Sequence, residues 1–156
     1  MLVRRMRIED LQAVAVAHHA AFVRQLDSEE WVACNFAAYP RIQIFVIQDG
    51  TQILGFIQWT QKSGFRKEVV LELEQLAVLP EVQGGGLGTR LIQESLPMVK
   101  AQLAERGASL KHIVVTTRAD NAAQRLYRKA LGAEVEAEIS NLYSADEVFM
   151  VARKVD

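Results

Sequence analysis

A glycine-rich run in the middle of the chain has the composition of a loop that binds a phosphate ester. The run consists of Gln83, Gly84, Gly85, Gly86, Leu87, Gly88 and Thr89. A phosphate-binding loop must turn several backbone N–H groups toward one anion, and side chains would obstruct that approach. A strand-like stretch (69–78) precedes the run and a helix-like stretch (90–106) follows it, so a helix dipole would add to the attraction. The sequence predicts an anion-binding loop, and the alternative is a plain glycine-rich start of a helix.

The spacing of these glycines separates three kinds of phosphate-binding loop. A P-loop requires Gly-x4-Gly-Lys-Ser/Thr, but Gln83 stands at its first glycine and Thr89 at its lysine. A dinucleotide-binding loop requires Gly-x-Gly-x-x-Gly, and its third glycine is replaced by Thr89 or Leu91 in the two available registers. The pattern Gln/Arg-x-x-Gly-x-Gly/Ala is met by Gln83, Gly86 and Gly88. Only the third pattern fits.

Two glutamates and a tyrosine are the other candidates for chemistry. Glu72 and Glu74 interrupt the apolar strand-like stretch, and strand alternation places both on the same face as Leu76. Asn121 and Tyr127 are six residues apart in a helix-like segment, which puts the tyrosine nearly two turns into the helix. A carboxylate whose pKa is raised by burial or by a like charge can accept a proton near pH 7, and a phenol with a pKa of about 10 can donate one.

Composition narrows the class of protein. A chain of 156 residues, half of them apolar and 24% charged, indicates one soluble globular domain over 1–156. The net charge of −1 gives no electrostatic case for nucleic acid or an anionic membrane as a partner. A single cysteine, Cys34, excludes an internal disulfide and suits a cytoplasmic location. No signal peptide and no apolar run long enough to span a bilayer is recognisable.

Hydrophobic periodicity and turn residues predict eleven elements. We expect strands at 2–6, 42–48, 53–61, 68–79, 111–117, 133–143 and 147–154, and helices at 10–26, from 27 or 28 to Pro40, at 90–106 and from 120 or 121 to 131. Asp49-Gly50 is a typical two-residue hairpin turn. The resulting order, β-α-α-β-β-β-α-β-α-β-β, indicates an α/β protein with a mixed sheet.

This order, the glycine loop and the segment Asn121-x-x-Ala-x-x-Leu-Tyr127 together resemble the GNAT N-acetyltransferase superfamily over about residues 3–153. The resemblance implies the GNAT fold: a central mixed seven-stranded sheet of α/β (α+β) class, flanked by four helices and splayed between its fourth and fifth strands. It also implies acetyl-CoA as co-substrate and a primary amine, in a small molecule or a peptide, as acceptor. The amine would attack the thioester directly in a ternary complex.

The resemblance also implies roles for individual residues. The backbone from Gly84 to Thr89 would hold the pyrophosphate, with the neutral Gln83 where many members have arginine. Leu76, Ala77 and Val78 would pair with the pantetheine arm, and one of their N–H groups would polarise the thioester carbonyl. Asn121 would help place the pantetheine, and Tyr127 would protonate the leaving thiolate. The alternative for these last two is a helix-capping asparagine and a core tyrosine.

Other assignments remain open at this stage. Glu72 or Glu74 would be the general base; alternatively, they belong to a solvated face or bind a cationic substrate. The aromatic residues Trp31, Phe36, Tyr39 and Trp59 suit an acceptor pocket and the core equally. Cys34 is expected in the core. The adjacent His18 and His19 point to different sides of a helix, so no metal site is predicted.

Two other functions are compatible with the sequence. One is a catalytically idle acyl-CoA-binding sensor, and the other is an acyltransferase for a longer acyl chain. A homodimer is compatible with the resemblance, although nothing in the sequence indicates the oligomeric state.

Overall fold

A computed structural model describes residues 1–153 and residue 155. Its elements follow the predicted order. They are β1 (Leu2–Arg5), η1 (Ile8–Asp10), α1 (Leu11–Ala21), α2 (Ser28–Ala37), β2 (Ile42–Asp49), β3 (Gln52–Gln61), β4 (Glu68–Val78), η2 (Pro80–Val82), α3 (Leu87–Glu105), β5 (Ser109–Arg118), α4 (Gln124–Leu131), β6 (Glu134–Ile139) and β7 (Glu147–Arg153). Lys154, the last residue of the final predicted strand, lies outside the described residues.

The strands form one seven-stranded sheet in the order β1-β2-β3-β4-β5-β7-β6. Pairing is antiparallel between β1 and β2, β2 and β3, β5 and β7, and β6 and β7, whereas β4 and β5 are parallel. The predicted mixed seven-stranded sheet with four helices is therefore confirmed. The register of β4 with β5 runs from Glu68↔Ser109 to Glu72↔Val114. The splay expected farther along these two strands stays a prediction.

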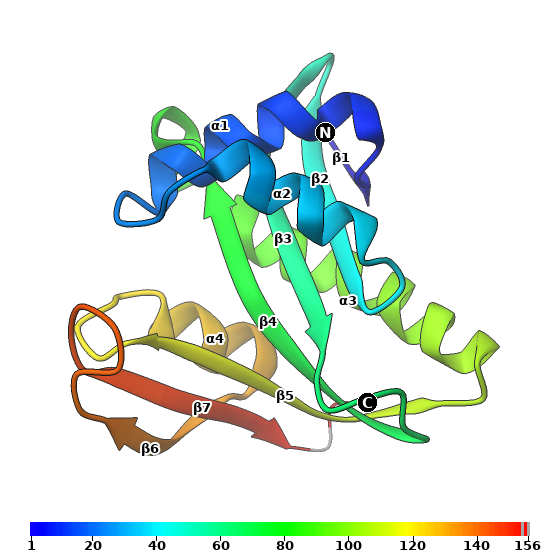
Figure 1. The fold of residues 1–156 in the computed structure, drawn as a ribbon, viewed down its shortest axis with the longest axis vertical. Coiled ribbons are helices and arrows are strands. Elements are labelled where there is room, and N and C mark those ends of the chain that lie inside the picture. The colour runs from blue at the N-terminus through cyan, green and yellow to red at the C-terminus, as the bar shows by residue number, and fades with distance from the viewer. Residues whose placement is uncertain (154, 156) are drawn as a thin grey trace. The chain divides into compact units, whose positions relative to one another are not determined.

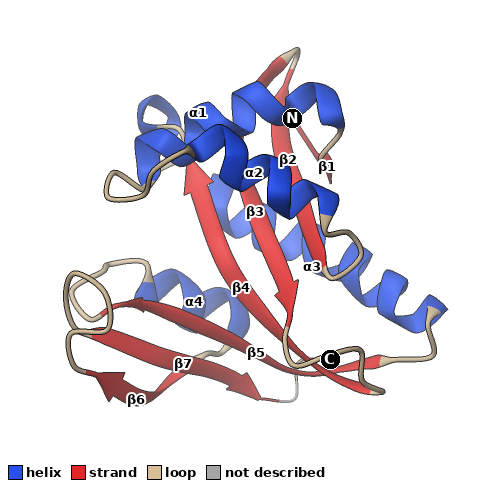
Figure 2. Ribbon diagram, in the orientation of Figure 1, coloured by secondary structure: helices blue, strands red, loops and turns tan. Residues whose placement is uncertain are grey.

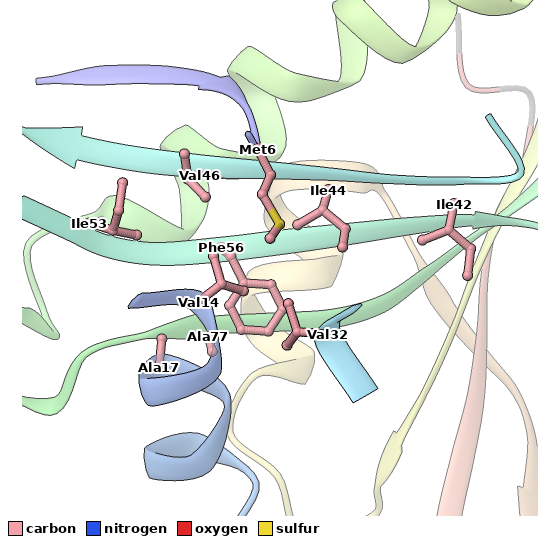
Figure 3. Packing of buried hydrophobic residues seen from close by; sticks show 10 residues of the cluster. All are labelled: Met6, Val14, Ala17, Val32, Ile42, Ile44, Val46, Ile53, Phe56 and Ala77. Carbon is pink, nitrogen blue, oxygen red and sulfur yellow. The ribbon is translucent and has the colours of Figure 1, made fainter. Parts of the chain in front are cut away.

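Contacts divide the chain into two compact units, and the first comprises residues 1–60 and 75–99. In this unit α1 and α2 lie in front of β2 and β3, and α3 runs behind them (Figure 1). The β-branched and aromatic residues of β2 and β3 are almost all buried on both faces, as expected for strands covered by helices on each side. Figure 3 shows the cluster under α1 and α2, made of Met6, Val14, Ala17, Val32, Ile42, Ile44, Val46, Ile53, Phe56 and Ala77.

The second unit comprises residues 61–74 and the chain from Lys100 onward. Here β5 pairs with β7, and β7 pairs with the edge strand β6, while α4 lies behind β5 in the view of Figure 2. One face of the strand pair is fully buried: Ile113, Met150 and Ala152 are 0% exposed. In contrast, every residue of β6 is exposed. Nothing in this division tests the prediction of a single domain.

Several predicted boundaries were wrong, each for a local reason. The first helix ends at Ala21 rather than residue 26, because the backbone of Phe22 leaves the helical region with φ −109° and ψ 68°. The hairpin turn is Gly50-Thr51 rather than Asp49-Gly50, since Asp49 pairs with Gln52. The third helix begins inside the glycine run, at Leu87.

The later boundaries differ as well. The fourth helix starts only at Gln124, after turns that the sequence suggested were already helical. The strand predicted at 133–143 is shorter, at Glu134–Ile139, because the segment that follows turns at Asn141, whose φ is 49°.

A partly buried polar network around His18 holds β4 against the two N-terminal helices. Nδ1 of His18 lies 2.7 Å from the Ser28 hydroxyl, and Nε2 lies 2.8 Å from Oε1 of Gln25. Gln75 on β4 donates to the same Gln25 oxygen at 3.0 Å and accepts from the Trp31 indole at 2.9 Å. Because Gln25 Oε1 can only accept, Nε2 of His18 carries the proton and Nδ1 accepts from Ser28. The neutral imidazole therefore satisfies the network.

This network predicts that stability falls in weak acid. Burial lowers the pKa of His18, an effect that its bond to Gln25 opposes and the nearby His19 reinforces. Between the lowered folded pKa and the unfolded value of about 6.5 the unfolded chain binds more protons, so the free energy of unfolding drops as pH falls below about 6.5. Urea unfolding at a series of pH values measures this slope.

Two variants test whether the imidazole of His18 causes this pH dependence of the free energy of unfolding. His18→Gln should flatten the decline below pH 6.5, whereas His19→Gln should keep it, because His19 is exposed. An undiminished decline in His18→Gln would show that another group causes it.

Candidate functional site

The glycine loop is built by a sharp change of backbone direction between β4 and α3. Gly84 and Gly86 have φ values of 85° and 77°, in the left-handed region that residues with a Cβ avoid. A Cβ added at either position would meet no atom within 4 Å. The space beside these glycines is therefore open, and their positive φ explains why glycine is needed here.

The N–H groups of this loop form a continuous unpaired series. Among the described residues, none of the backbone N–H groups from Gly84 to Thr89 has a backbone acceptor, and pairing resumes with Arg90, which donates to Gly86 at 3.1 Å. Gln83 to Gly86 are exposed. Exposed N–H groups at a helix N-terminus favour an anion, so the predicted anion-binding loop has the donors that it needs.

Gln83 has a local role that the sequence did not suggest. Its side-chain amide donates to the carbonyl of Val78 at 3.1 Å, which ties the start of the loop to the end of β4. The predicted contact of this side chain with phosphate would have to use the second hydrogen of the amide. The loop backbone is thus better prepared to hold an anion than the Gln83 side chain.

The end of β4 lies very close to β3. A Cβ on Gly55 would come 2.4 Å from the carbonyl oxygen of Ala77 and 3.1 Å from the Cα of Val78. Leu79 donates to Leu54 at 2.8 Å on the same side. The absence of a side chain at Gly55 therefore lets the backbone of Ala77 and Val78, two of the three residues predicted to pair with pantetheine, lie this close to β3. Their alternating burial, with Leu76 and Val78 half-buried and Ala77 buried, fits a strand with one covered face.

Glu72 and Glu74 share the half-buried face of β4, as alternation predicted. Glu72 forms an ion pair with Lys62, with Nζ 3.1 Å from Oε2, and its side chain is 17% exposed. A carboxylate on this face can bind a cation or accept a proton. Neither glutamate is distinguished by this geometry, so the general-base role stays a prediction for both.

Tyr127 lies on α4 and is 7% exposed. Burial raises the pKa of its phenol to about 12. Among the described residues, its hydroxyl has no hydrogen-bond partner. Because burial disfavours the charged phenolate, the hydroxyl keeps its proton far above neutral pH. The phenol can therefore donate a hydrogen bond to a ligand.

Asn121 is engaged at both ends of its amide. Oδ1 accepts from the N–H of Ala123 at 2.9 Å, and Nδ2 donates to the Thr117 hydroxyl at 3.0 Å. The side chain thus joins the end of β5 to the turn that leads into α4. Asn121 is not the helix cap of the alternative, because the N-cap of α4 is Ala123. A pantetheine contact would have to use the remaining hydrogen or lone pair of the amide, and the predicted contact stays a prediction.

The four aromatic candidates for an acceptor pocket separate in the structure. Trp59 is 0% exposed and donates to Ser95 on α3 at 2.8 Å, so it belongs to the core. Trp31 is 37% exposed and belongs to the His18 network. Phe36 and Tyr39 line a shallow pocket in the first unit. Its full lining is Arg5, Met6, Phe36, Tyr39, Ile42 and Ile44.

Two further findings concern reactive side chains. The prediction that Cys34 lies in the core was wrong, because it occupies an outward position on α2 and is exposed. In the described part of the chain, no group of three or more His, Cys, Asp or Glu side chains could hold a metal ion.

A helix that spans a membrane requires a certain length and hydropathy. None of the described helices is long and apolar enough to cross a membrane.

Glu147 was missed by the sequence reasoning. It is the first residue of β7 and is 7% exposed, opposite Arg118 on β5. A glutamate at the start of a predicted strand was a signal in the sequence, but the pairing of β5 with β7 is needed to see its neighbours.

Comparison with known proteins gives the same fold. Solved structures that superimpose on it include an aminoglycoside 6'-N-acetyltransferase complexed with coenzyme A, with 16% identity, TM-score 0.78 and coverage of 98% of this chain and 97% of that one. The ribosomal-protein-S18-alanine N-acetyltransferase from Escherichia coli has 20% identity, TM-score 0.76 and coverages of 97% and 92%. A chimeric spermidine N-acetyltransferase from Vibrio cholerae has 16% identity, TM-score 0.76 and coverages of 98% and 96%.

These low identities show the fold alone, and a search of curated proteins found no match. The sequence itself provides the family. The model of the Acetyltransferase (GNAT) family matches residues 10–133, a range that includes both N-terminal helices, the glycine loop and α4. The chain therefore belongs to the GNAT family of acetyltransferases.

Proposed function

We propose that this protein is an acetyl-CoA-dependent N-acetyltransferase that acts on a primary amine. The observation that carries the proposal is the unpaired series of N–H groups from Gly84 to Thr89, which ends in the first turn of α3. Six consecutive unpaired donors suit the pyrophosphate of coenzyme A, and the open space beside Gly84 and Gly86 lets that group approach the backbone. The Thr89 hydroxyl is a further donor at the start of the helix.

The chain's residues would divide the acetyl transfer between them. Backbone groups of Leu76 to Val78 hold the pantetheine arm, and one N–H donates to the thioester oxygen as it gains negative charge. Glu72 or Glu74 accepts the proton of the attacking amine, directly or through water. Tyr127 donates to the departing thiolate, since its phenol remains protonated at neutral pH. Much of the rate would come from positioning the two substrates.

The acceptor is proposed as an amine on chemical grounds. The half-buried face of β4 carries two carboxylates, and one Lys62 ammonium pairs with Glu72. The excess of negative charge favours a cationic acceptor over an anionic one. The names of the three similar proteins described above state their acceptors: an aminoglycoside, a ribosomal-protein alanine and spermidine. These are all amines, so the common feature supports the class of acceptor and leaves its identity open.

Release of free coenzyme A tests this function. Purified protein is incubated with acetyl-CoA and a panel of polyamines, aminoglycosides and short peptides, and the new thiol is quantified. We expect amine-dependent thiol release that vanishes when each acceptor is supplied in N-acetylated form. Tight acetyl-CoA binding without release for any amine would instead favour the idle acyl-CoA-binding sensor. Comparing affinities for acetyl-CoA and longer thioesters separates the remaining alternative.

A further inference from the structure

Glu147 is a buried carboxylate without an ion-pair or hydrogen-bond partner among the described residues. It is 7% exposed, and its Oε2 lacks any partner. Arg118 stands directly opposite in the register of β5 with β7 but is held elsewhere. Its Nε lies 3.0 Å from Oδ1 of Asp120, and its Nη2 lies 3.1 Å from Oδ2. Burial raises the pKa of Glu147. The positive charge of Arg118 opposes this increase, and the negative charge of Asp120 adds to it.

The surroundings of Glu147 are partly open. Alternation places Glu147 on the same face of the strands as Phe149 and Thr116, and both of these are half-buried. Through the registers of β4 with β5 and of β5 with β7, Glu72 belongs to that face too. The opposite face holds residues such as Met150, which is 0% exposed. The carboxylate therefore lies on the more exposed of the two faces of this strand pair, with Oε2 itself covered by its neighbours.

We propose that Glu147 binds an ammonium group of the acceptor amine on this face of β5 and β7. This inference rests on the proposed function, because it names the group that recognises the acceptor. A buried carboxylate with a free oxygen is stabilised by a cation that donates hydrogen bonds, and an ammonium group supplies both. Because Arg118 is hydrogen-bonded to Asp120, it does not pair with the carboxylate of Glu147. Phe149 adds an apolar surface for the carbon chain of the amine.

Calorimetric titration with diaminobutane tests the proposal, with butanediol as a neutral ligand of the same length. We expect the wild-type protein to bind the diamine and not the diol. Glu147→Gln keeps the shape of the side chain and removes the charge, and it should weaken diamine binding at least tenfold. Its melting temperature should rise by about 2 °C or more, since an unpaired buried charge is lost. A structural ion pair would give the opposite shift.

Glu138→Gln is the matched control, because Glu138 is an exposed glutamate on the neighbouring strand β6. It should bind diaminobutane as the wild type does. Equal affinities in Glu147→Gln and wild type, a lowered melting temperature in Glu147→Gln, or no diamine binding by the wild type would each overturn the proposal. Acetyl-CoA affinity is measured in parallel and should be unchanged in both variants. A wild-type protein that did not bind acetyl-CoA would instead count against the proposed function.

Discussion

Replacing Gly86 with valine is expected to abolish acetyl-CoA binding. Gly86 has a φ of 77°, and a β-branched residue in that region costs on the order of 1–3 kcal/mol. The loop would relieve this strain by turning its backbone, which would change the directions of the N–H groups of residues 84–89. Because the proposed pyrophosphate site would use these donors together on one anion, we expect at least about a hundredfold loss of affinity. Calorimetric titration with acetyl-CoA in the absence of an acceptor measures it.

A second glycine separates this effect from backbone strain alone. Gly64 has a φ of 90°, and a Cβ there would also meet no atom within 4 Å, but it lies in the link between β3 and β4. Gly64→Val should therefore cost comparable stability and leave acetyl-CoA affinity unchanged. Unaltered affinity in Gly86→Val would refute the loop as the pyrophosphate site. An equal loss in both variants would attribute the effect to general destabilisation.

Local chemistry made the order of elements and the loop predictable from sequence. Glycines at Gly84 and Gly86 are informative because a positive φ there excludes most other residues. Alternation in β4 correctly grouped Glu72, Glu74 and Leu76, because the period of a strand is fixed by its backbone. The boundaries were less accurate. The first helix ended at Ala21, because the backbone of Phe22 leaves the helical region, which the residue pattern did not indicate.

Long-range contacts account for what could not be predicted. The network around His18 joins this residue of α1, through Gln25, to Gln75 on β4. The hydrogen bond of Trp59 to Ser95 joins β3 to α3. Neither pairing leaves a pattern in the sequence. The same is true of Glu147, whose unpaired state depends on Arg118 being held by Asp120. Residue type and spacing thus indicate a cofactor loop, whereas the acceptor side depends on strand register.

Tyr127→Phe is expected to lower turnover by about a hundredfold or more while leaving acetyl-CoA affinity in place. The change removes the phenol hydroxyl, which has no hydrogen-bond partner among the described residues. The fold therefore loses no hydrogen bond that the structure shows. The departing thiolate would lose its proton donor, and general acid catalysis is typically worth 10²–10⁴-fold in rate. Steady-state rates of thiol release, with acetyl-CoA affinity measured separately, test the split.

Tyr143 provides the comparison, because it is a tyrosine in the same unit that is 75% exposed. Tyr143→Phe should turn over at the wild-type rate, and a wild-type rate in Tyr127→Phe would remove Tyr127 from the role of acid.

The pH dependence gives a second test of Tyr127. With a pKa of about 12, the phenol stays protonated through any practical assay range, so its ionisation should cause no fall in rate below about pH 11. Between the unfolded value of about 10 and the folded value the folded chain binds more protons, so stability should fall as pH rises through that window. Tyr127→Phe should remove this alkaline loss, which denaturant unfolding at pH 9 and pH 11 can measure. A fall in the wild-type rate with a midpoint near pH 10 that is absent from the pH profile of Tyr127→Phe would contradict a buried, protonated donor, since only an exposed phenol ionises there.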